Sequence, residues 1–204
     1  MITLYGITRS RALRCLWMLE ELGVPYQREL VAQADVHAPD YLRINPNGHI
    51  PTLKDGELVL WESLAINLYL ADTYGKGLWP ASVADRGRCY QWSIWAMTEL
   101  EGLLLTAMRH RSSLPEAERD PAAAAKAEES ARKPFGVLEA VLASRPYLLG
   151  AEFSVADLNV AAVASWTRLG KVELGPFPKA ADWLARCIGR PAYKAALKEP
   201  RASA

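Results

Sequence analysis

The segment 45–70, NPNGHIPTLKDGELVLWESLAINLYL, constrains the fold more than any other part of the chain. Two apolar-rich runs, 50–54 and 57–61, flank the dipeptide Asp55-Gly56, which accepts the positive φ of a tight type I′ turn. Apolar residues then follow over 64–70. The segment therefore predicts a β-hairpin whose second strand leads directly into the N-terminus of a helix.

Glu62 and Ser63 stand at this strand-to-helix junction. The first turn of a helix presents unpaired N–H donors and a partial positive charge, so it binds a carboxylate well. The Ser63 hydroxyl adds a donor, and Glu62 can accept an ammonium group. The pair would suit the two charged ends of an amino acid. The plainer interpretation is that Ser63 caps the helix and Glu62 favours its dipole.

Pro51 opens the first strand of the hairpin and cannot donate to the strand ladder. A cis Ile50–Pro51 bond would turn the backbone of Ile50 outward and leave its N–H and C=O free for an extended peptide. The sequence is compatible with either isomer.

Length and composition indicate a globular chain with one large domain or two small ones, since 204 residues can bury a good core. A net charge of +1 gives no reason to expect nucleic acid or an anionic membrane as partner. No signal peptide is visible, and the apolar stretches are shorter than the ~20 residues that span a bilayer. The three widely spaced cysteines fit free thiols in a reducing cytosol, and the histidines show no metal-ligand spacing.

The first part of the chain alternates strands and helices. A strand is expected over 2–6, a helix over 10–22 with Gly23 as its stop, a strand over 25–31 and a short helix over 40–44. With the hairpin and the helix after it, the order is β-α-β-α-β-β-α. This order is expected of a thioredoxin-like domain, which we place at residues 1–76.

A Gly/Pro-rich linker, 75–80, separates this domain from a chain that is almost entirely helical. Helical patterns cover 84–110 and 121–142, where Pro134 should kink or interrupt the helix, and then 154–168, 178–188 and 191–198, before a frayed tail at 201–204. The predicted fold class is α/β plus all-α, with an all-helical domain at residues 84–204.

A second motif opens the helix expected after residue 153. Ser154 and Asp157 have capping-box spacing, and Phe153 with Leu158 can form the hydrophobic staple around it. We assign this motif a structural role and no chemistry.

The pattern N-P-N-G-H-I-P-T-L, the hairpin and W-E-S-L-A-I together resemble the glutathione-binding segment of cytosolic glutathione transferases. The capping box is similar to the one in that family's helical domain, and the LYG strand and W-M-L-E-E-L-G helix end fit bacterial members. The resemblance implies a glutathione S-transferase that conjugates the glutathione thiolate to small hydrophobic electrophiles in detoxification. It also implies a cytoplasmic homodimer with glutathione as co-substrate and no metal.

The resemblance assigns parts of the 45–63 segment to glutathione. Glu62 and Ser63 would hold the γ-glutamyl end, and the main chain of Ile50, before Pro51, would pair with the cysteinyl unit as in strand addition. His49 could reach the glycine carboxylate, although an exposed loop histidine is more often a bystander.

Activation of the thiol needs a further group. Lowering a thiol pKa from ~8.5 to about 6.5 requires roughly 2.7 kcal/mol, and a helix N-terminus supplies at most about 2 kcal/mol. A hydroxyl or cationic donor must therefore face the sulfur, and the candidates are Ser10, Thr8 and Arg11. Ser10 is the first choice, because an N-cap hydroxyl can accept an N–H and still donate its own hydrogen. The loop holds no cysteine and Tyr5 lies within the strand, which argues against the mixed-disulfide and tyrosine variants.

The electrophile would sit between the domains against the helical half. The residues expected to line its pocket are Trp92, Trp95, Met108, Arg109 and Trp166. An aromatic stripe at helical spacing is also typical of a core. Two other functions stay open on the same fold, namely a glutathione-dependent reductase or isomerase and a non-catalytic glutathione-binding module.

Overall fold

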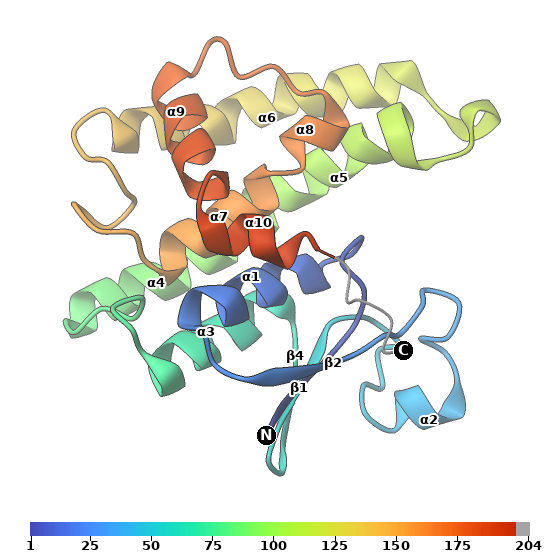
Figure 1. The fold of residues 1–204 in the computed structure, drawn as a ribbon. Coiled ribbons are helices and arrows are strands. Elements are labelled where there is room, and N and C mark those ends of the chain that lie inside the picture. Colours follow the sequence, from blue (N-terminus) through green and yellow to red (C-terminus); the bar gives the residue numbers. More distant parts are fainter. Residues whose placement is uncertain (199–204) are drawn as a thin grey trace. The chain divides into compact units, whose positions relative to one another are not determined.

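The computed structural model of the chain describes residues 1–198 (Figure 1). The chain divides into two compact units: Met1–Trp79 together with residues 190–198, and Pro80–Gly189. The division near residue 80 falls at the end of the predicted linker. The last described helix, α10 (Pro191–Ala196), belongs to the first unit, whereas the sequence led us to expect it in the helical domain. The tail expected at 201–204 lies outside the described residues.

The first unit is a thioredoxin-like α/β domain, as predicted. Its elements are β1 (Ile2–Tyr5), α1 (Ala12–Leu22), β2 (Tyr26–Glu29), α2 (Pro39–Leu42), β3 (Thr52–Asp55), β4 (Leu58–Trp61) and α3 (Ser63–Tyr74), with α10 added. The four-stranded sheet has the order β2-β1-β3-β4, in which β2 is parallel to β1 and the other pairs are antiparallel. In Figure 1, α1 and α3 lie side by side over the sheet, and α2 lies apart from them.

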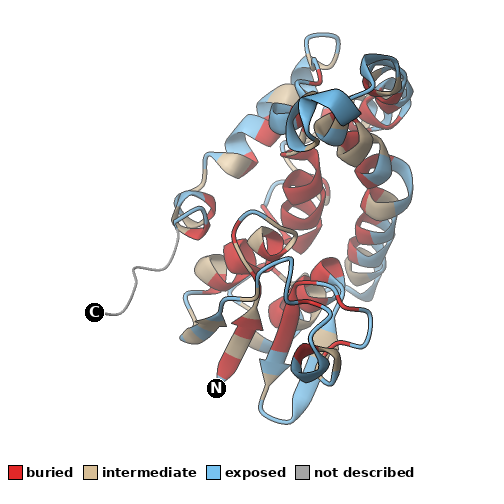
Figure 2. Cartoon of the chain, turned by 90° about the vertical axis from the view of Figure 1, so that its right-hand side faces the viewer, coloured by how far each residue is buried: buried red, intermediate tan, exposed pale blue. Residues whose placement is uncertain are grey.

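Apolar alternation and one glycine explain the first strand–helix–strand unit. Ile2 and Leu4 of β1 are buried while Thr3 and Tyr5 are partly exposed, which is the period of two expected of a strand. Figure 2 shows the buried residues following the central strands. Gly23 ends α1 in the left-handed region (φ 57) and donates its N–H to the Leu19 carbonyl at 2.9 Å.

The hairpin forms where expected, but its turn differs from the predicted type. Asp55 stays in β3 and pairs with Leu58, so the two-residue loop is Gly56-Glu57. Among the described residues with positive φ, Gly56 (φ 60) is the one in this turn. A type I′ turn needs positive φ at both central residues, so the glycine instead occupies the first central position, as in a type II′ turn.

Packing on α1 explains why α10 joins the first unit. The rings of Trp17 and Tyr193 meet edge to face with centroids 4.9 Å apart. Arg190 donates to both carboxylate oxygens of Glu21, at 2.6 and 2.8 Å. The partners in these contacts lie far apart in the sequence, so no local sequence pattern predicts them.

The second unit is all-helical. Its elements are α4 (Val83–Trp95), η1 (Ala96–Glu101), α5 (Gly102–Met108), η2 (Arg109–Ser113), η3 (Glu116–Glu118), α6 (Pro121–Leu142), α7 (Val155–Ala164), α8 (Thr167–Gly170) and α9 (Pro178–Ile188). The long helix predicted over 84–110 is present, with the π-helical segments η1 and η2 on either side of α5. Pro134 lies inside α6 without interrupting it.

The core of the second unit is built around α7, in which every residue is buried. Asp157 accepts hydrogen bonds from the Ser154 N–H, the Ser154 hydroxyl, the Leu148 N–H and the Trp183 indole N–H, at 2.8 to 3.1 Å. Burial raises the pKa of the Asp157 carboxyl against the lowering effect of these four donors. Phe153 and Leu158 are both buried beside the box. Within residues 1–198, no helix is long and apolar enough to cross a membrane.

Candidate active site

The register of the sheet brings three candidate segments to one edge. Tyr5 pairs with Thr52, and Thr52 pairs with Trp61, so these residues form one row across three strands. The loop before α1 leaves this row from β1, the Ile50-Pro51 segment enters it at β3, and Glu62-Ser63 leaves it from β4. Segments separated by some fifty positions therefore meet at the same end of the sheet, as the sequence assignment requires.

Close packing confirms that the first two segments adjoin. A Cβ added to Gly6 (φ 145) would lie 2.7 Å from the Ala12 Cβ and 3.5 Å from the Ile50 Cβ. Because real Cβ atoms do not approach within 3.0 Å, glycine is required at this position. The loop before α1 can thus pass directly against Ile50.

The strand-to-helix junction contains an unusual backbone. Glu62, the N-cap of α3, has φ 72 and ψ 105, although it is not a glycine, and its side chain is exposed. Its carbonyl accepts the first helical hydrogen bond, from the Ile66 N–H at 2.9 Å. A conformation of this kind costs on the order of 1–3 kcal/mol and is concentrated at functional sites. The junction is therefore a strained position at the end of β4, and the buried Ser63 follows it directly.

The Ile50–Pro51 peptide bond is cis, and the residue before it is held from behind. The His49 carbonyl accepts hydrogen bonds from the Tyr41 hydroxyl at 2.7 Å and the Asn45 side-chain amide at 2.8 Å. The Ile50 side chain is buried against Val36 and Tyr41. In the described part of the chain, the main-chain N–H and C=O of Ile50 take no hydrogen bond, which leaves both available to a ligand.

The three candidates for thiol activation differ in how they are held. Ser10 is half-buried, and its hydroxyl accepts the Ala12 N–H at 3.0 Å and donates to the Ile7 carbonyl at 2.6 Å. Thr8 is only 7% exposed, and its hydroxyl accepts from the Arg28 guanidinium at 2.6 Å. Arg11 is half-buried at the N-cap of α1. Ser10 is the more accessible hydroxyl, but its hydrogen is already engaged.

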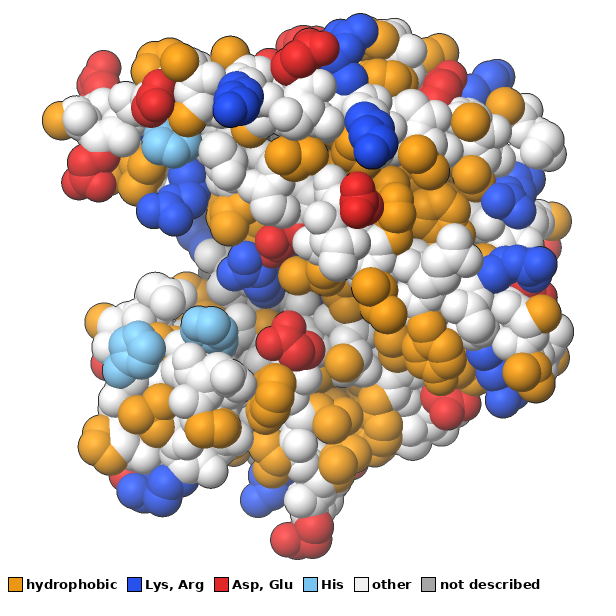
Figure 3. All heavy atoms as spheres, turned by 180° about the vertical axis from the view of Figure 1, so that it is seen from behind, with side chains coloured by type: hydrophobic (Ala, Val, Ile, Leu, Met, Phe, Trp, Pro, Cys, Tyr) orange, Lys and Arg blue, Asp and Glu red, His pale blue; other side chains and the backbone are white. Residues whose placement is uncertain are grey.

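Histidine side chains lie on the face of the molecule drawn in Figure 3. His49 is exposed, as expected. His37 lies over Gly48, because a Cβ added there would come within 2.5 Å of the His37 Nδ1. No role for His37 was predicted, since the spacing of the histidines matches no metal motif and a contact with Gly48 depends on the path of the intervening loop.

Arg14 is a second residue that the sequence did not single out. It lies on α1, is only 2% exposed and donates to the Ser63 hydroxyl at 3.3 Å. The signal that could have revealed it is a charge among the buried positions of an apolar helix, three residues before Trp17.

The five residues predicted for the electrophile pocket all lie in the second unit but do not form one cluster. Trp92 is buried and meets Trp95 edge to face, with ring centroids 5.1 Å apart. Met108 ends α5 and Arg109 begins η2. At 1.5 Å per residue, both lie about 20 Å from Trp95 along the helix. Trp166 is the half-buried N-cap of α8. Trp92 thus has the packing of a core residue.

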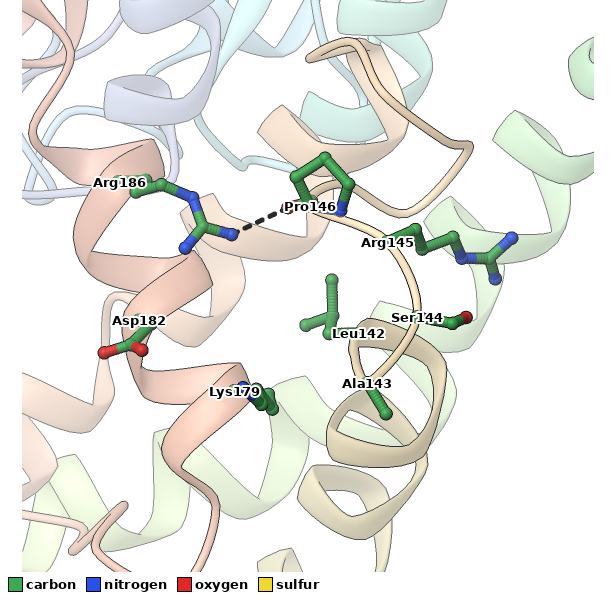
Figure 4. Close-up of a pocket in the computed structure, with 8 residues that line it drawn as sticks. All are labelled: Leu142, Ala143, Ser144, Arg145, Pro146, Lys179, Asp182 and Arg186. Carbon is green, nitrogen blue, oxygen red and sulfur yellow. Dashed lines mark hydrogen bonds between the residues drawn. The ribbon is translucent and has the colours of Figure 1, made fainter.

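A shallow cavity of about 330 Å³ opens in the second unit, between the end of α6 and α9 (Figure 4). Arg186 is tied there to the Pro146 carbonyl at 2.8 Å, and Arg145 points away from the cavity. Its lining does not include any of the predicted site residues. In residues 1–198, no group of three His, Cys, Asp or Glu side chains is placed to hold a metal ion.

The first unit is a thioredoxin-like domain that carries a cis-proline loop and, at the same end of its sheet, an acidic residue and a serine at a helix start. The second unit is all-helical. Together they define a class of proteins in which a thioredoxin-like domain is joined to a helical one. Comparison with known proteins narrows this class. Residues 1–72 match the model of the glutathione S-transferase N-terminal domain, and residues 95–191 match that of the C-terminal domain.

Individual relatives agree over nearly the full length. The chain is 35% identical to glutathione S-transferase GstB of Escherichia coli, covering 98% of this chain and 99% of GstB. It is 30% identical to the disulfide-bond oxidoreductase YfcG of Escherichia coli, covering 97% and 94%. A theta class glutathione S-transferase of Xanthomonas axonopodis pv. citri, solved with glutathione bound, superposes with a TM-score of 0.89 at 35% identity over 98% of each chain.

The chain belongs to the glutathione S-transferase family and is an enzyme of that family.

Proposed function

We propose that the protein binds glutathione along the edge formed by Ile50, Glu62 and Ser63 and transfers its thiolate to small hydrophobic electrophiles. The observation that carries this proposal is the row Tyr5–Thr52–Trp61, because the loop before α1, the Ile50-Pro51 segment and Glu62-Ser63 all adjoin it at one end of the sheet. The structure of the Xanthomonas relative with glutathione bound supports it.

The charged ends of the tripeptide match the groups at this edge. The γ-glutamyl carboxylate meets the α3 N-terminus and the Ser63 hydroxyl, and its ammonium group meets the exposed Glu62 carboxylate. The cysteinyl N–H and C=O pair with the main chain of Ile50, beside Pro51. His49, with His37 beside Gly48, faces the glycine carboxylate.

Ser10 activates the thiol in this proposal. Its hydroxyl hydrogen turns from the Ile7 carbonyl to the sulfur when the thiol gives its proton to water. The thiolate then attacks the electrophilic carbon, forming a C–S bond while the leaving group departs with the bonding electron pair. Thr8 and Arg11 are the alternative donors, although Thr8 is more deeply buried and held by Arg28.

The helical unit supplies the apolar wall for the electrophile. Trp95, Met108, Arg109 and Trp166 are the proposed lining residues, because each is at least partly exposed. Trp92 supports Trp95 from within the core. No metal is needed for this step, since the reactive group is the thiolate itself.

The proposal is tested by calorimetric titration with glutathione, alongside turnover of chloro-dinitrobenzene. Ser63→Ala should weaken glutathione binding about tenfold, as expected for one hydrogen bond to a charged group. Ser144→Ala, at an exposed position of the second unit, is the matched control and should bind as the unaltered chain does. Absence of heat with the unaltered chain at millimolar ligand would contradict the proposal.

A second candidate is a glutathione-dependent reductase, which the similarity to YfcG favours. Turnover of disulfides or hydroperoxides without turnover of aryl halides would establish it. Retention on immobilised glutathione with neither activity would instead indicate a binding module.

The assembly and location of the protein are also proposals. We propose a homodimer, supported by the family and by the exposed Val83, Tyr90 and Ile94, which recur on one face of α4. A sedimentation coefficient of the monomer at micromolar concentration would contradict this. A cytoplasmic location is supported by the reduced thiols of Cys15, Cys89 and Cys187.

A further inference from the structure

Arg14 carries a charge in an unexpected place. It lies on α1 among apolar residues and is only 2% exposed. A buried cation is costly unless it is paired or hydrogen-bonded, so its surroundings should explain why arginine stands there. One of its partners is the Ser63 hydroxyl, which accepts from Nη1 at 3.3 Å across 49 positions of sequence.

Further bonds fix the two helices around this contact. The Cys15 thiol donates to the Ser63 carbonyl at 3.4 Å, and the Asn67 side chain donates to the Arg14 carbonyl at 3.2 Å. Burial raises the pKa of the Cys15 thiol, so it stays protonated and keeps its donor role. The guanidinium is therefore held at the first turn of α3.

The direction of the Arg14–Ser63 bond determines what Ser63 can do. A guanidinium has five donors and no acceptor, so the serine oxygen must accept and cannot donate back. Within the described residues, the Ser63 hydroxyl hydrogen meets no protein acceptor. Serine at the end of a strand and the start of a helix could otherwise turn its hydrogen toward a nearby carbonyl. The arginine keeps the lone pair occupied and leaves the hydrogen for a ligand.

We propose that Arg14 is a positioning residue for anion binding at the start of α3, acting through the Ser63 hydroxyl. It orients that hydroxyl to donate to the α-carboxylate of the γ-glutamyl group. This inference rests on the proposed function, because it assumes that glutathione is the ligand. Arg14 does not itself touch the ligand in this account.

The test compares two ligands. Arg14→Met replaces the guanidinium by an apolar side chain of similar length, a change that buried sites often tolerate. We expect its dissociation constant for glutathione to rise about tenfold, as for loss of one oriented hydrogen bond to a charge. With a glutathione analogue whose γ-glutamyl α-carboxylate is amidated, the two proteins should bind within about twofold of each other. Arg14→Lys keeps a charge but loses the planar fork, so its dissociation constant for glutathione should lie between those of the unaltered chain and Arg14→Met.

A double substitution separates positioning from general damage. In the Ser63→Ala background, Arg14→Met should change glutathione affinity by less than about twofold, because the hydroxyl through which Arg14 acts on the ligand is absent. Arg190→Met is the matched control: it removes an arginine that packs against the other end of α1 and should leave glutathione affinity unchanged.

Three outcomes would overturn the inference. They are an unchanged affinity in Arg14→Met, an equal loss of affinity for the amidated analogue, and a full tenfold effect in the Ser63→Ala background. If Arg14→Met does not fold, the same comparison of ligands with Arg14→Lys decides the question. Absence of glutathione binding by the unaltered chain would instead overturn the proposed function, and this inference with it.

Discussion

Replacing Ser10 by alanine tests how the thiol is activated. The Ser10 hydroxyl donates to the Ile7 carbonyl at 2.6 Å. Turning it to a thiolate exchanges a neutral hydrogen bond of about 1 kcal/mol for a charge-assisted one of about 1.5–3 kcal/mol. The net gain is therefore about 1 kcal/mol, or somewhat less than one pKa unit.

The helix adds a similar amount. The N-terminus of α1 contributes about 0.3–1 kcal/mol, and its Ala12 N–H is already used by Ser10. Together these effects lower a thiol pKa from ~8.5 to about 7. Ser10→Ala should raise the pKa of bound glutathione by about one unit. At neutral pH, kcat/KM should fall about fivefold, and the difference should vanish at high pH, where both proteins hold the thiolate.

The assay is the pH dependence of kcat/KM, together with the ultraviolet absorbance of the bound thiolate. Ser10→Ala also removes the acceptor of the Ala12 N–H, which should cost about 1 kcal/mol of stability without greatly changing glutathione affinity. Ser10→Thr keeps the hydroxyl and is the control. An unchanged thiol pKa in Ser10→Ala, with a raised one in Thr8→Val, would refute the assignment and move the role to Thr8.

Three further predictions concern the stability of the fold. Glu62→Gly should melt at the same temperature as the unaltered chain or higher, because glycine adopts a positive φ without strain. It should nevertheless bind glutathione about as weakly as Glu62→Gln, since both variants lack the carboxylate. A lower melting temperature in Glu62→Gly than in Glu62→Gln would contradict this. The hydrogen bond to Asp55 raises the pKa of Tyr74 to about 12, so its stabilising contribution is full below about pH 10 and lost as the pH rises toward 12. In urea unfolding, the free energy of unfolding should fall less steeply between pH 10 and 12 for Tyr74→Phe than for the unaltered chain. The same pH dependence in both proteins would contradict this. Asp157→Ala leaves buried donors without their acceptor and should cost at least about 3 kcal/mol in urea unfolding, so a loss below about 1 kcal/mol would show that the box is dispensable.

Local patterns predicted many elements of both units. The hairpin, the helix after Glu62 and the left-handed stop at Gly23 follow from residues close together in sequence, and α6 begins and ends at the predicted residues. The predicted loop was wrong by one position, because Asp55 extends the β3 ladder instead of entering the loop. The predicted turn type was wrong for the same reason. A turn signal marks the reversal of the chain, but cross-strand pairing decides which residues form the loop.

Long-range contacts could not be predicted. The place of α10 depends on Tyr193 meeting Trp17, and the environment of Ser63 depends on Arg14, 49 positions earlier. Neither contact has a periodic signature. The π-helical segments beside α5 have none either, since their residues continue the same helical pattern. The sequence therefore proposes which segments form the candidate site, while the contacts of Arg14 behind Ser63 emerge only from the fold.

A crystal structure of the protein with glutathione tests the central claim most directly. We expect the cysteinyl unit within hydrogen-bond distance of the Ile50 main-chain N and O, and the γ-glutamyl carboxylate against the Ser63 hydroxyl. A tripeptide bound elsewhere, with the Ile50 edge and the start of α3 unoccupied, would contradict the account.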